Sequence, residues 1–454
     1  MRPLSLAALL AIPGGAAAVH HQAVHRLTRR STSLAAPSST SSSLSSSAPL
    51  RRPQPRSRHE RRRGDRQRGL EEDEEDGAAP ESTDPVVEGI GTHYAYAWVG
   101  TPPQRQSVIL DTGSYKTAFP CEPCSDCSDS EHGDYTQYHE SGPFVPSASS
   151  TLETFETTSE NTWSQSYSEG DGWTAEVVRD VVYLGGETAD DPPHAADQAV
   201  TFKFGCQTQI GGLFITQEAD GIMGMGMKNS FTFVHALLDG GQLERDAFSL
   251  CFARGGGSLA LGGSMPAEQH AAPMEYAALG AKGSFFGVTW QDLRLVPSSD
   301  RGASTGSSIM DYGARSDGFG GSSQTIIDSG TTFTYIPSAL RTGFEDLWEE
   351  VTGFKYQTEE SLDPDVDVDG LPDLLFAFAR KDGGGGDQVF VTVKPSAYVD
   401  VYCPYDEGHA DYGPGDCYNF LSIMFEGHTQ ILGANFMQDH DVYFDTTVGG
   451  RSRE

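Results

Sequence analysis

Two aspartates occupy the same kind of sequence setting, one in each half of the chain. Asp111 ends the apolar run 108–110 and is followed by Thr-Gly-Ser, and Asp328 ends the run 325–327 and is followed by Ser-Gly-Thr. Burying a carboxylate at the end of an apolar strand costs free energy unless it is hydrogen-bonded or paired. Two such acids side by side cannot both ionise, so the pair would share one proton and titrate as a unit. A pair of this kind can take a proton from a water molecule while it polarises a carbonyl group.

The residues that follow each acid suit this chemistry. Gly113 and Gly330 would let the backbone turn tightly and place N–H groups against the carboxylates. The hydroxyls of Ser114 and Thr331 would hydrogen-bond the outer carboxylate oxygens. One Asp-Ser/Thr-Gly triplet is an ordinary exit from a strand into a turn. Two copies, each after an apolar run and before a hydroxyl residue, indicate a functional pair.

The rest of the chain has the composition of a β protein. Short apolar runs bounded by Gly, Ser, Asp and Pro recur, the chain holds 52 glycines, and amphipathic helical periodicity is scarce. At 454 residues it exceeds what one core usually holds, so we expect two lobes plus extensions. The run 213–216 is among the predicted strands, and 339–351 is the clearest amphipathic helix. Downstream of each acid stand two apolar residues and a glycine, at 222–224 and 431–433.

These four motifs, in this order, resemble the pepsin-like aspartic proteases over about residues 90–448. The resemblance implies an all-β bilobal fold with two pseudo-symmetric lobes and a cleft between them. Each lobe would supply one aspartate from a loop threaded beneath the apolar-apolar-Gly strand. The implied catalytic residues are Asp111 and Asp328, and the implied supporting residues are Gly113, Ser114, Gly330 and Thr331.

The family also has a β-hairpin flap that carries a tyrosine. The match here is Tyr167-Ser168-Glu169-Gly170, followed by the strand 177–184. By this resemblance Tyr167 and Gly170 belong to the flap, and Tyr167 would close on a bound peptide and exclude water. A plain solvent-exposed hairpin would have a similar sequence.

Familiar members place a tryptophan seven residues after the first aspartate, bonded to the flap tyrosine, where this chain has Ala118. Together with Cys121, Cys124 and Cys127, this departure is similar to the nepenthesin-like and plasmepsin V-type branches. Those relatives carry a further cysteine before the flap tyrosine, and this chain does not, so the pairing of the three cysteines stays open.

The same three cysteines, with His132 or His139, could instead ligate zinc. We favour disulfides, and we expect neither a metal nor another cofactor. Seven cysteines in an exported chain indicate disulfides, and the odd number leaves one thiol free or paired between chains. Cys403 and Cys417 form a plausible pair.

The N-terminal segment predicts export. Arg2, the apolar run 4–12 and the small residues 16–18 are typical of a signal peptide, which we place at 1–18. Residues 19–85 are Ser-rich, then Arg/Pro-rich, then acidic, and we expect a disordered propeptide or linker. The N-terminal lobe, with Asp111 and the flap, is predicted at 86–270.

The C-terminal lobe, with Asp328, is predicted at 271–454. The chain stops soon after 442–444, where the family usually adds a final strand, so the end has diverged or is truncated. No segment after the leader is apolar enough to span a membrane. We expect a secretory-pathway location, either extracellular or in a lysosome- or vacuole-like lumen.

The distribution of charged residues limits which classes of molecule the protein can bind. Residues 1–85 carry 13 Lys and Arg against 10 Asp and Glu, whereas residues 86–454 carry 18 against 54. So acidic a body repels phosphates, which excludes nucleic acid as a partner. We expect a monomer that acts on peptide or protein substrates.

The resemblance therefore implies an aspartic endopeptidase that hydrolyses peptide bonds with an activated water and without an acyl-enzyme. The alternative is an inactive, inhibitor-like relative that only binds peptides or proteins. Retention of both acids argues against the alternative. The absent tryptophan and the divergent C-terminal end keep it open.

Overall fold

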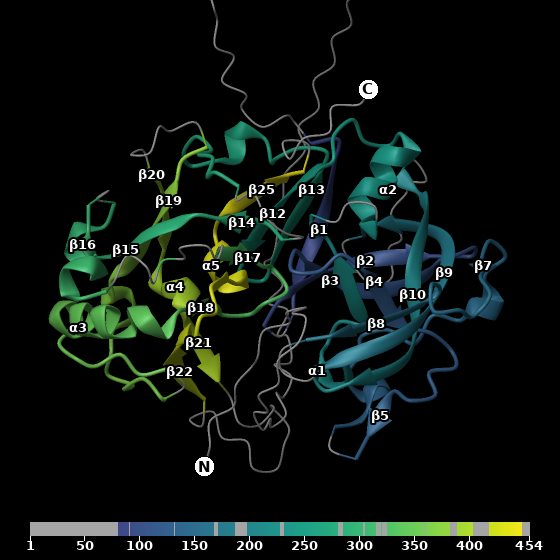
Figure 1. Ribbon diagram of the computed structural model, residues 1–454, viewed down its shortest axis with the longest axis horizontal. Helices are drawn as coiled ribbons and strands as arrows, with labels where there is room; N and C mark the ends of the chain where they lie inside the picture. Colours follow the sequence, from purple (N-terminus) through teal and green to yellow (C-terminus); the bar gives the residue numbers. More distant parts are fainter. Residues whose placement is uncertain are drawn as a thin grey trace, which may run out of the picture. The chain divides into compact units, whose positions relative to one another are not determined.

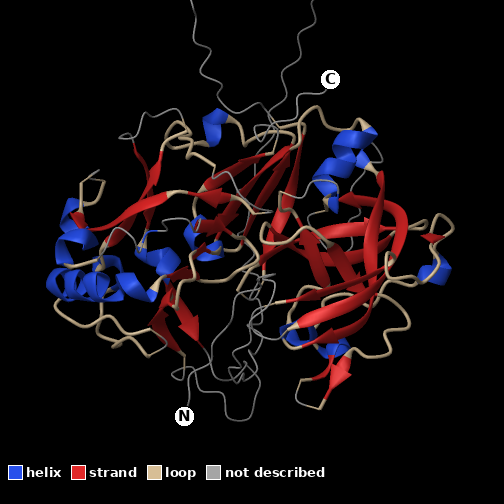
Figure 2. Ribbon diagram, in the orientation of Figure 1, coloured by secondary structure: helices blue, strands red, loops and turns tan. Residues whose placement is uncertain are grey.

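Strands dominate the part of the chain that the structure describes (Figure 2). The structure is a computed structural model, and it describes residues 80–89, 91–130, 132–167, 171–186, 198–227, 231–279, 285–302, 305–314, 319, 325–358, 360–381, 388–402 and 417–446. The predicted all-β fold is confirmed. The predicted signal peptide lies outside the described residues, as does most of the predicted propeptide. The lobe boundary at residue 270 stays a prediction.

One large sheet contains most strands of the first half of the chain together with β25, in the order β25-β12-β13-β1-β2-β3-β11-β4-β10-β9-β7, with β8 paired to β9. Its members are β1 (Ser82–Glu88), β2 (His93–Val99), β3 (Gln104–Asp111), β4 (Thr117–Pro120), β7 (Glu153–Thr154), β8 (Thr162–Ser166), β9 (Gly172–Leu184), β10 (Val200–Gly211), β11 (Gly221–Gly224), β12 (Ala247–Ala253), β13 (Gly256–Leu261) and β25 (Asp441–Asp445). Strand β25 comes from the end of the described chain and lies beside β12 (Figure 1). Within the described residues, regular structure begins at Ser82, upstream of the predicted start at residue 86.

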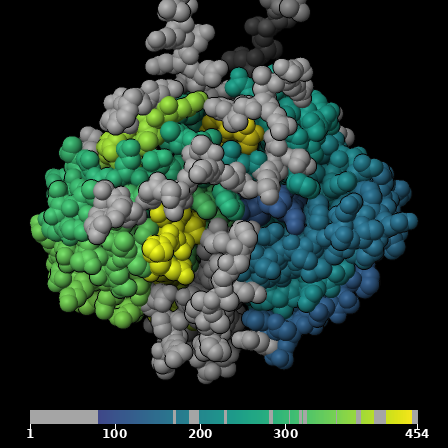
Figure 3. Space-filling view, in the orientation of Figure 1, coloured from purple at the N-terminus to yellow at the C-terminus, as the bar shows by residue number. Residues whose placement is uncertain are grey.

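The second half of the chain builds smaller sheets. Five strands pair in the order β14 (Gly287–Val288), β17 (Thr325–Ile327), β24 (Ile431–Leu432), β18 (Thr334–Ile336) and β23 (Ile423–Phe425). Four others pair as β16 (Ser307–Ser308), β15 (Trp290–Val296), β19 (Asp373–Ala379) and β20 (Gln388–Val393). A two-stranded sheet of this half pairs β21 (Val399–Tyr402) with β22 (Tyr418–Leu421). In the first half of the chain, β5 (Ser128–Asp129) pairs with β6 (Gly133–Asp134) outside the large sheet. Figure 3 shows residues of the second half, coloured green and yellow, on the surface of the molecule.

The helices are short and few in the described residues. They are α1 (Leu213–Thr216), α2 (Phe233–Gly240), α3 (Arg341–Thr352), α4 (Pro395–Tyr398) and α5 (Ala434–Met437). Helix α3 matches the predicted amphipathic segment, because it buries Phe344, Leu347 and Trp348 and ends at Gly353, whose φ of 80° suits glycine. In the described parts of the chain, no helix combines the length and the apolar character needed to cross a membrane.

The prediction of a strand at 213–216 is wrong, because these residues form helix α1. A short apolar run fits a buried strand and a buried helical turn equally well. The chain turns at Gly212, whose φ is 66°, and the amide of Leu213 donates to Asp171 Oδ1 at 3.3 Å. This turn and this side-chain acceptor start a helical turn where the apolar pattern alone favoured a strand.

Disulfides connect the cysteine cluster to the large sheet. Cys121 pairs with Cys206, and Cys124 pairs with Cys127. Cys417 is disulfide-bonded, but its predicted partner Cys403 lies outside the described residues. Cys251 is a free thiol, which agrees with the odd number of cysteines.

A buried acid on β1 makes stability depend on pH. Asp84 is 7% exposed, its Oδ2 has no hydrogen-bond partner among the described residues, and burial raises its pKa to about 6. When the pKa of an acid is higher in the folded protein than in the unfolded chain, its contribution to stability is fully present at a pH below the unfolded-chain pKa. That contribution is lost as the pH rises through the folded value.

We therefore expect the free energy of unfolding to increase as the pH falls from 7 to 4. Asp84→Asn should remove about 2–3 kcal/mol of that rise, because a pKa difference of about two units is involved. Urea unfolding of both proteins at pH 4, 5, 6 and 7 measures the difference. If the free energy of unfolding depended on pH in the same way in both proteins, Asp84 would not be the source of the pH dependence.

Candidate active site

Asp111 is the last residue of strand β3, Asp328 immediately follows strand β17, and both side chains are fully buried. Each strand pairs in parallel with one of the apolar-apolar-Gly strands. In β11, Gly224 lies opposite Asp111, and in β24, Leu432 lies opposite Ile327. The amide of Asp328 also donates to the Leu432 carbonyl at 2.9 Å. The four sequence motifs thus form two matching supports, one for each acid.

The two carboxyl groups have equivalent hydrogen bonds. The amide of Gly113 donates to Asp111 Oδ1 at 2.8 Å, and the amide of Gly330 donates to Asp328 Oδ1 at 2.9 Å. The Ser114 hydroxyl donates to Asp111 Oδ2. The Thr331 hydroxyl donates to Asp328 Oδ2 at 2.8 Å. Each acid is therefore held at both oxygens by the two residues that sequence analysis selected.

The residues between each acid and its glycine join the two halves of the site. Thr112 and Ser329 exchange hydrogen bonds: each backbone amide donates to the other's hydroxyl oxygen, at 3.0 and 2.9 Å. The Thr112 hydroxyl donates to the Ile327 carbonyl at 2.9 Å, and the Ser329 hydroxyl donates to the Leu110 carbonyl at 2.6 Å. Both side chains are fully buried. We call these four bonds the cross-link, and sequence analysis did not assign these residues a role.

The two glycines are needed because the acids face them across the site. A Cβ at Gly113 would lie less than 3.0 Å from the Asp328 carboxyl group, and a Cβ at Gly330 would lie equally close to Asp111. No ordinary side chain fits at such a distance. Each glycine therefore leaves room for the opposite acid as well as binding its own.

Burial and proximity shift the pKa of both acids upward. Burial raises the pKa of Asp111 well above its ordinary value, and the neighbouring Asp328 carboxyl raises it further. Burial also raises the pKa of Asp328, although hydrogen bonds from Thr331 and Asp111 oppose that shift. The pair therefore behaves as one unit that holds a shared proton to higher pH than a free aspartate would.

Tyr167 immediately follows strand β8 and lies close enough to this pair for the charge of Asp111 to act on its hydroxyl. It is 5% exposed, its amide donates to the Asp171 carbonyl at 2.9 Å, and its ring packs against Phe214 of α1. Burial and then the nearby charge of Asp111 raise its pKa well above its ordinary value, so the hydroxyl keeps its proton. Strands β8 and β9 pair as the predicted hairpin. Gly170 lies outside the described residues.

Two tryptophans take the place of the one that is absent at position 118. Trp173 Nε1 donates to the Tyr167 hydroxyl at 3.3 Å, from strand β9 of the same hairpin. Trp163 packs in the same buried cluster as Ala118, Tyr167 and Trp173. Sequence analysis missed both, although two tryptophans so close in sequence to the predicted flap tyrosine were a usable signal.

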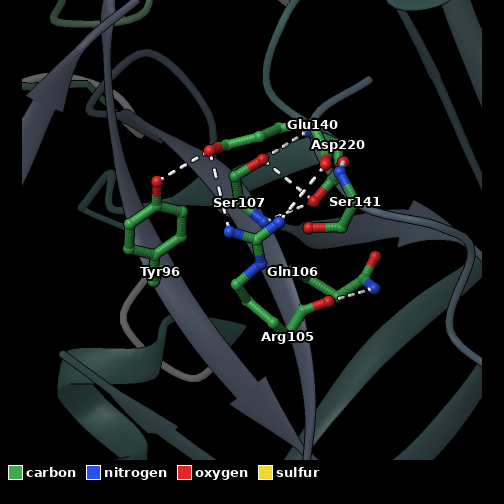
Figure 4. Close-up of polar contacts among 7 residues, drawn as sticks. All are labelled: Tyr96, Arg105, Gln106, Ser107, Glu140, Ser141 and Asp220. Carbon is green, nitrogen blue, oxygen red and sulfur yellow. Dashed lines mark hydrogen bonds and ion pairs between the residues drawn. The ribbon is translucent and has the colours of Figure 1, made fainter. Parts of the chain in front are cut away.

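A second polar network binds the first half of strand β3, away from Asp111 (Figure 4). Asp220 accepts hydrogen bonds from the Ser107 amide at 2.6 Å and from the Ser141 amide at 2.7 Å. Burial raises the pKa of Asp220 to about 6, and these donors act against the shift. Nearby, the Tyr96 hydroxyl donates to Glu140 Oε1 at 2.8 Å. Asp220 immediately precedes β11 and is bonded to Ser107 of β3, so it connects the two strands that position Asp111.

The zinc alternative does not fit this structure. The sulfurs of Cys121, Cys124 and Cys127 are all bonded in disulfides, so they are not available as thiolate ligands. The His139 ring instead lies at 2.9 Å from the Phe214 carbonyl oxygen.

Comparison with known proteins gives a family match over most of the chain. A family model described as eukaryotic aspartyl protease matches residues 93–449. Aspartic protease 5 of Toxoplasma gondii is 27% identical in an alignment of 328 residues that covers 59% of this chain and 32% of that protein. Aspartyl protease family protein 1 of Arabidopsis thaliana is 26% identical in an alignment of 387 residues that covers 79% of this chain and 66% of that protein.

A shorter match is found with plasmepsin V of Plasmodium falciparum. It is 28% identical over 185 residues, which cover 38% of this chain and 30% of that protein. The chain therefore spans less than two thirds of the length of each of these relatives.

Proposed function

Because the chain belongs to the eukaryotic aspartyl protease family, we propose that it is an aspartic endopeptidase that hydrolyses peptide bonds through the Asp111–Asp328 pair. The observation that carries the proposal is the buried pair itself. Both acids sit without exposure to solvent, with matched hydrogen bonds and raised pKa values. A protein that only bound peptides would gain nothing from this costly arrangement.

The proposed reaction uses the shared proton of the pair. A water molecule between the carboxyl groups gives one proton to the ionised acid as it attacks the scissile carbonyl carbon. The protonated acid gives its proton to the carbonyl oxygen, which forms a neutral tetrahedral diol. Collapse of the diol returns a proton to the amine as the C–N bond breaks, so no covalent enzyme intermediate forms. The Tyr167 hydroxyl, held by Trp173, would close the site over the peptide.

This chemistry needs the pair to hold one proton, so we place the working range in acid. The disulfides support a location in the secretory pathway, outside the cell or in a lysosome- or vacuole-like lumen. The acidic composition of residues 86–454 suits such a compartment, because many carboxylates would be neutral there.

Digestion of a peptide library from pH 3 to pH 7 tests the proposal, with mass-spectrometric mapping of the cleaved bonds. The protein should cleave within chains, in acid, and Asp111→Asn should not. Equal cleavage by both would overturn the mechanism. Failure of both to cleave, with retained peptide binding, would favour the inhibitor-like alternative. That alternative has lost one support, because Trp173 supplies the hydrogen bond to Tyr167 that the absent tryptophan at position 118 would have made.

The Trp173 hydrogen bond has a measurable effect in this scheme. Trp173→Phe removes the donor to Tyr167 and keeps most of the buried ring, so we expect kcat/KM to fall about 5–10-fold. Trp348→Phe is the matched control, because Trp348 is buried and its Nε1 has no partner among the described residues. Steady-state kinetics on one peptide compares the three proteins. An equal loss in both variants would show that ring volume, not the hydrogen bond, matters.

A further inference from the structure

A cavity in the second half of the chain is lined by strand β20, helix α4 and the residues that follow helix α5. Its volume is about 140 Å³. A single buried water needs only about 10–15 Å³ of such space, so this cavity has room for a larger ligand. We call it the α5 cavity, and its lining residues are Thr392, Lys394, Ala397, Gln438, Asp439 and His440.

The α5 cavity lies at the far end of a segment that begins beside the second acid. At the start of α5, the amide of Ala434 donates to the Thr331 carbonyl at 2.6 Å. After the end of α5, the amide of Asp439 donates to the Phe252 carbonyl of β12 at 2.8 Å. Helix α4, on the other side of the cavity, packs against α5 (Figure 1). None of the lining residues belongs to the candidate active site.

The chain turns sharply at Asp439, between two of the lining residues. Asp439 has a φ of 63° and is the only residue other than glycine with a positive φ in the described ranges. A residue with a side chain adopts this conformation at a cost in free energy, and it persists where the surroundings hold it. The bond to Phe252 holds it here. Because of the turn, Gln438 and His440 both line the cavity from one segment.

The cavity residues have hydrogen-bond donors that nothing in the described residues uses. The Nδ1 atom of His440 lies 2.8 Å from the Gln438 carbonyl oxygen, which only accepts, so Nδ1 carries the ring proton. Protonation of the ring would then add a donor at Nε2. The Gln438 Nε2 atom is buried without a hydrogen-bond partner among the described residues. Lys394 is exposed and forms no ion pair with another described residue.

Two basic side chains face each other at the cavity. Burial lowers the pKa of His440 below its ordinary value, the Gln438 carbonyl and the Asp439 carboxylate raise it, and the Lys394 ammonium lowers it. Lys394 and His440 are therefore close enough to repel each other when both are charged. A negative group between them would remove this repulsion and would accept the unused hydrogen bonds.

From this geometry we propose that the α5 cavity binds a small oxyanion, either a carboxylate or a tetrahedral anion such as phosphate, between Lys394 and His440. The amide of Gln438 and the hydroxyl of Thr392 are further donors at the cavity. The bound anion would stabilise the segment that connects Asp328 to strand β25. The inference does not depend on the proposed endopeptidase function.

Isothermal titration calorimetry with sulfate and, separately, with formate tests the proposal at constant ionic strength, because both probes keep their charge from pH 5 to pH 8. The wild type should bind at least one of them at pH 5. Lys394→Met should weaken that binding about tenfold, the effect of losing one charge-assisted hydrogen bond. Lys355→Met is the matched control, since it removes an exposed lysine that does not line the cavity, and its Kd should equal that of the wild type.

The pH dependence of binding gives a second measurement. An anion favours the protonated ring, so its affinity should fall as the pH rises through the pKa of His440. His440→Gln should lose most of the difference in Kd between pH 5 and pH 8. The other charged groups that act on this ring are Asp439, from its own segment, and Lys394, from between β20 and α4. Asp439→Asn removes the one acid of the lining and should tighten binding about two- to fivefold.

The outcomes are distinct. Binding that weakens in Lys394→Met but not in Lys355→Met supports the site, and the probe with the lower Kd shows whether it prefers a tetrahedral or a planar anion. If the wild type binds neither probe, or if both lysine variants weaken binding equally, the α5 cavity is not an anion site. An unchanged Kd in both Lys394→Met and Asp439→Asn would also overturn the proposal. Thermal unfolding without a probe verifies that each variant is folded.

Discussion

Asp111→Asn is expected to lower kcat/KM about 10³-fold or more, because it removes a group that exchanges protons with water and substrate in the proposed reaction. The change is nearly isosteric: the amide oxygen of Asn can still accept from the Gly113 amide, and its NH2 group can donate to the Ser114 hydroxyl oxygen once that hydroxyl rotates. It also removes one of two like-charged groups that are buried together. We therefore expect the loss of activity to come with unchanged or increased stability toward unfolding.

The combination of lost activity and retained stability separates a catalytic role from a structural one. Asp328→Asn should behave in the same way, because the two acids have equivalent contacts. Asp84→Asn is the matched control, a buried aspartate with a raised pKa on strand β1. It should keep its activity in acid. Steady-state kinetics at pH 4 together with urea unfolding measures both quantities, and an inactive but destabilised Asp111→Asn would argue for misfolding instead.

The cross-link provides the second large effect. Thr112→Val keeps the shape of the side chain but removes the hydroxyl that donates to Ile327 and accepts from the Ser329 amide. Both partners are then left buried without a bond, and each orphaned group costs about 1–3 kcal/mol. We expect the free energy of unfolding to fall by about 2–4 kcal/mol, and kcat to fall because the two acids lose their fixed separation.

Thr117→Val is the control for this prediction. Thr117 is equally buried, and its hydroxyl has no partner among the described residues, so its removal should be neutral or stabilising. Urea unfolding and kinetics on both variants complete the comparison. Equal effects of the two substitutions would mean that the cross-link adds nothing beyond packing.

The sequence predicted the parts of the site that are encoded locally. The acids, their glycines and their hydroxyl partners lie within four consecutive residues, so the contacts of Asp111 with Gly113 and Ser114 follow from a single turn. The large sheet was also predictable as a class, because alternating apolar runs and turn residues indicate strands wherever they occur.

Features that depend on which strands become neighbours were not predictable. The Cys121–Cys206 disulfide forms because β4 and β10 pair in parallel, with Cys206 opposite Phe119, and nothing in the cysteine spacing indicates that register. The Trp173 bond to Tyr167 depends on how strands β8 and β9 pair. Helix α1 depends on Asp171, a residue far from it in sequence.

The pairing of β25 with β12 has a consequence for synthesis. The Thr446 hydroxyl donates to the Asp246 carbonyl, 200 residues earlier, so the far edge of the large sheet is closed by residues made much later. Until those residues leave the ribosome, β12 has an open row of backbone donors and acceptors, and open edges invite pairing between chains. During synthesis, the first half of this protein can fold before β25 has been made. We expect the chain to be most prone to aggregation in that interval.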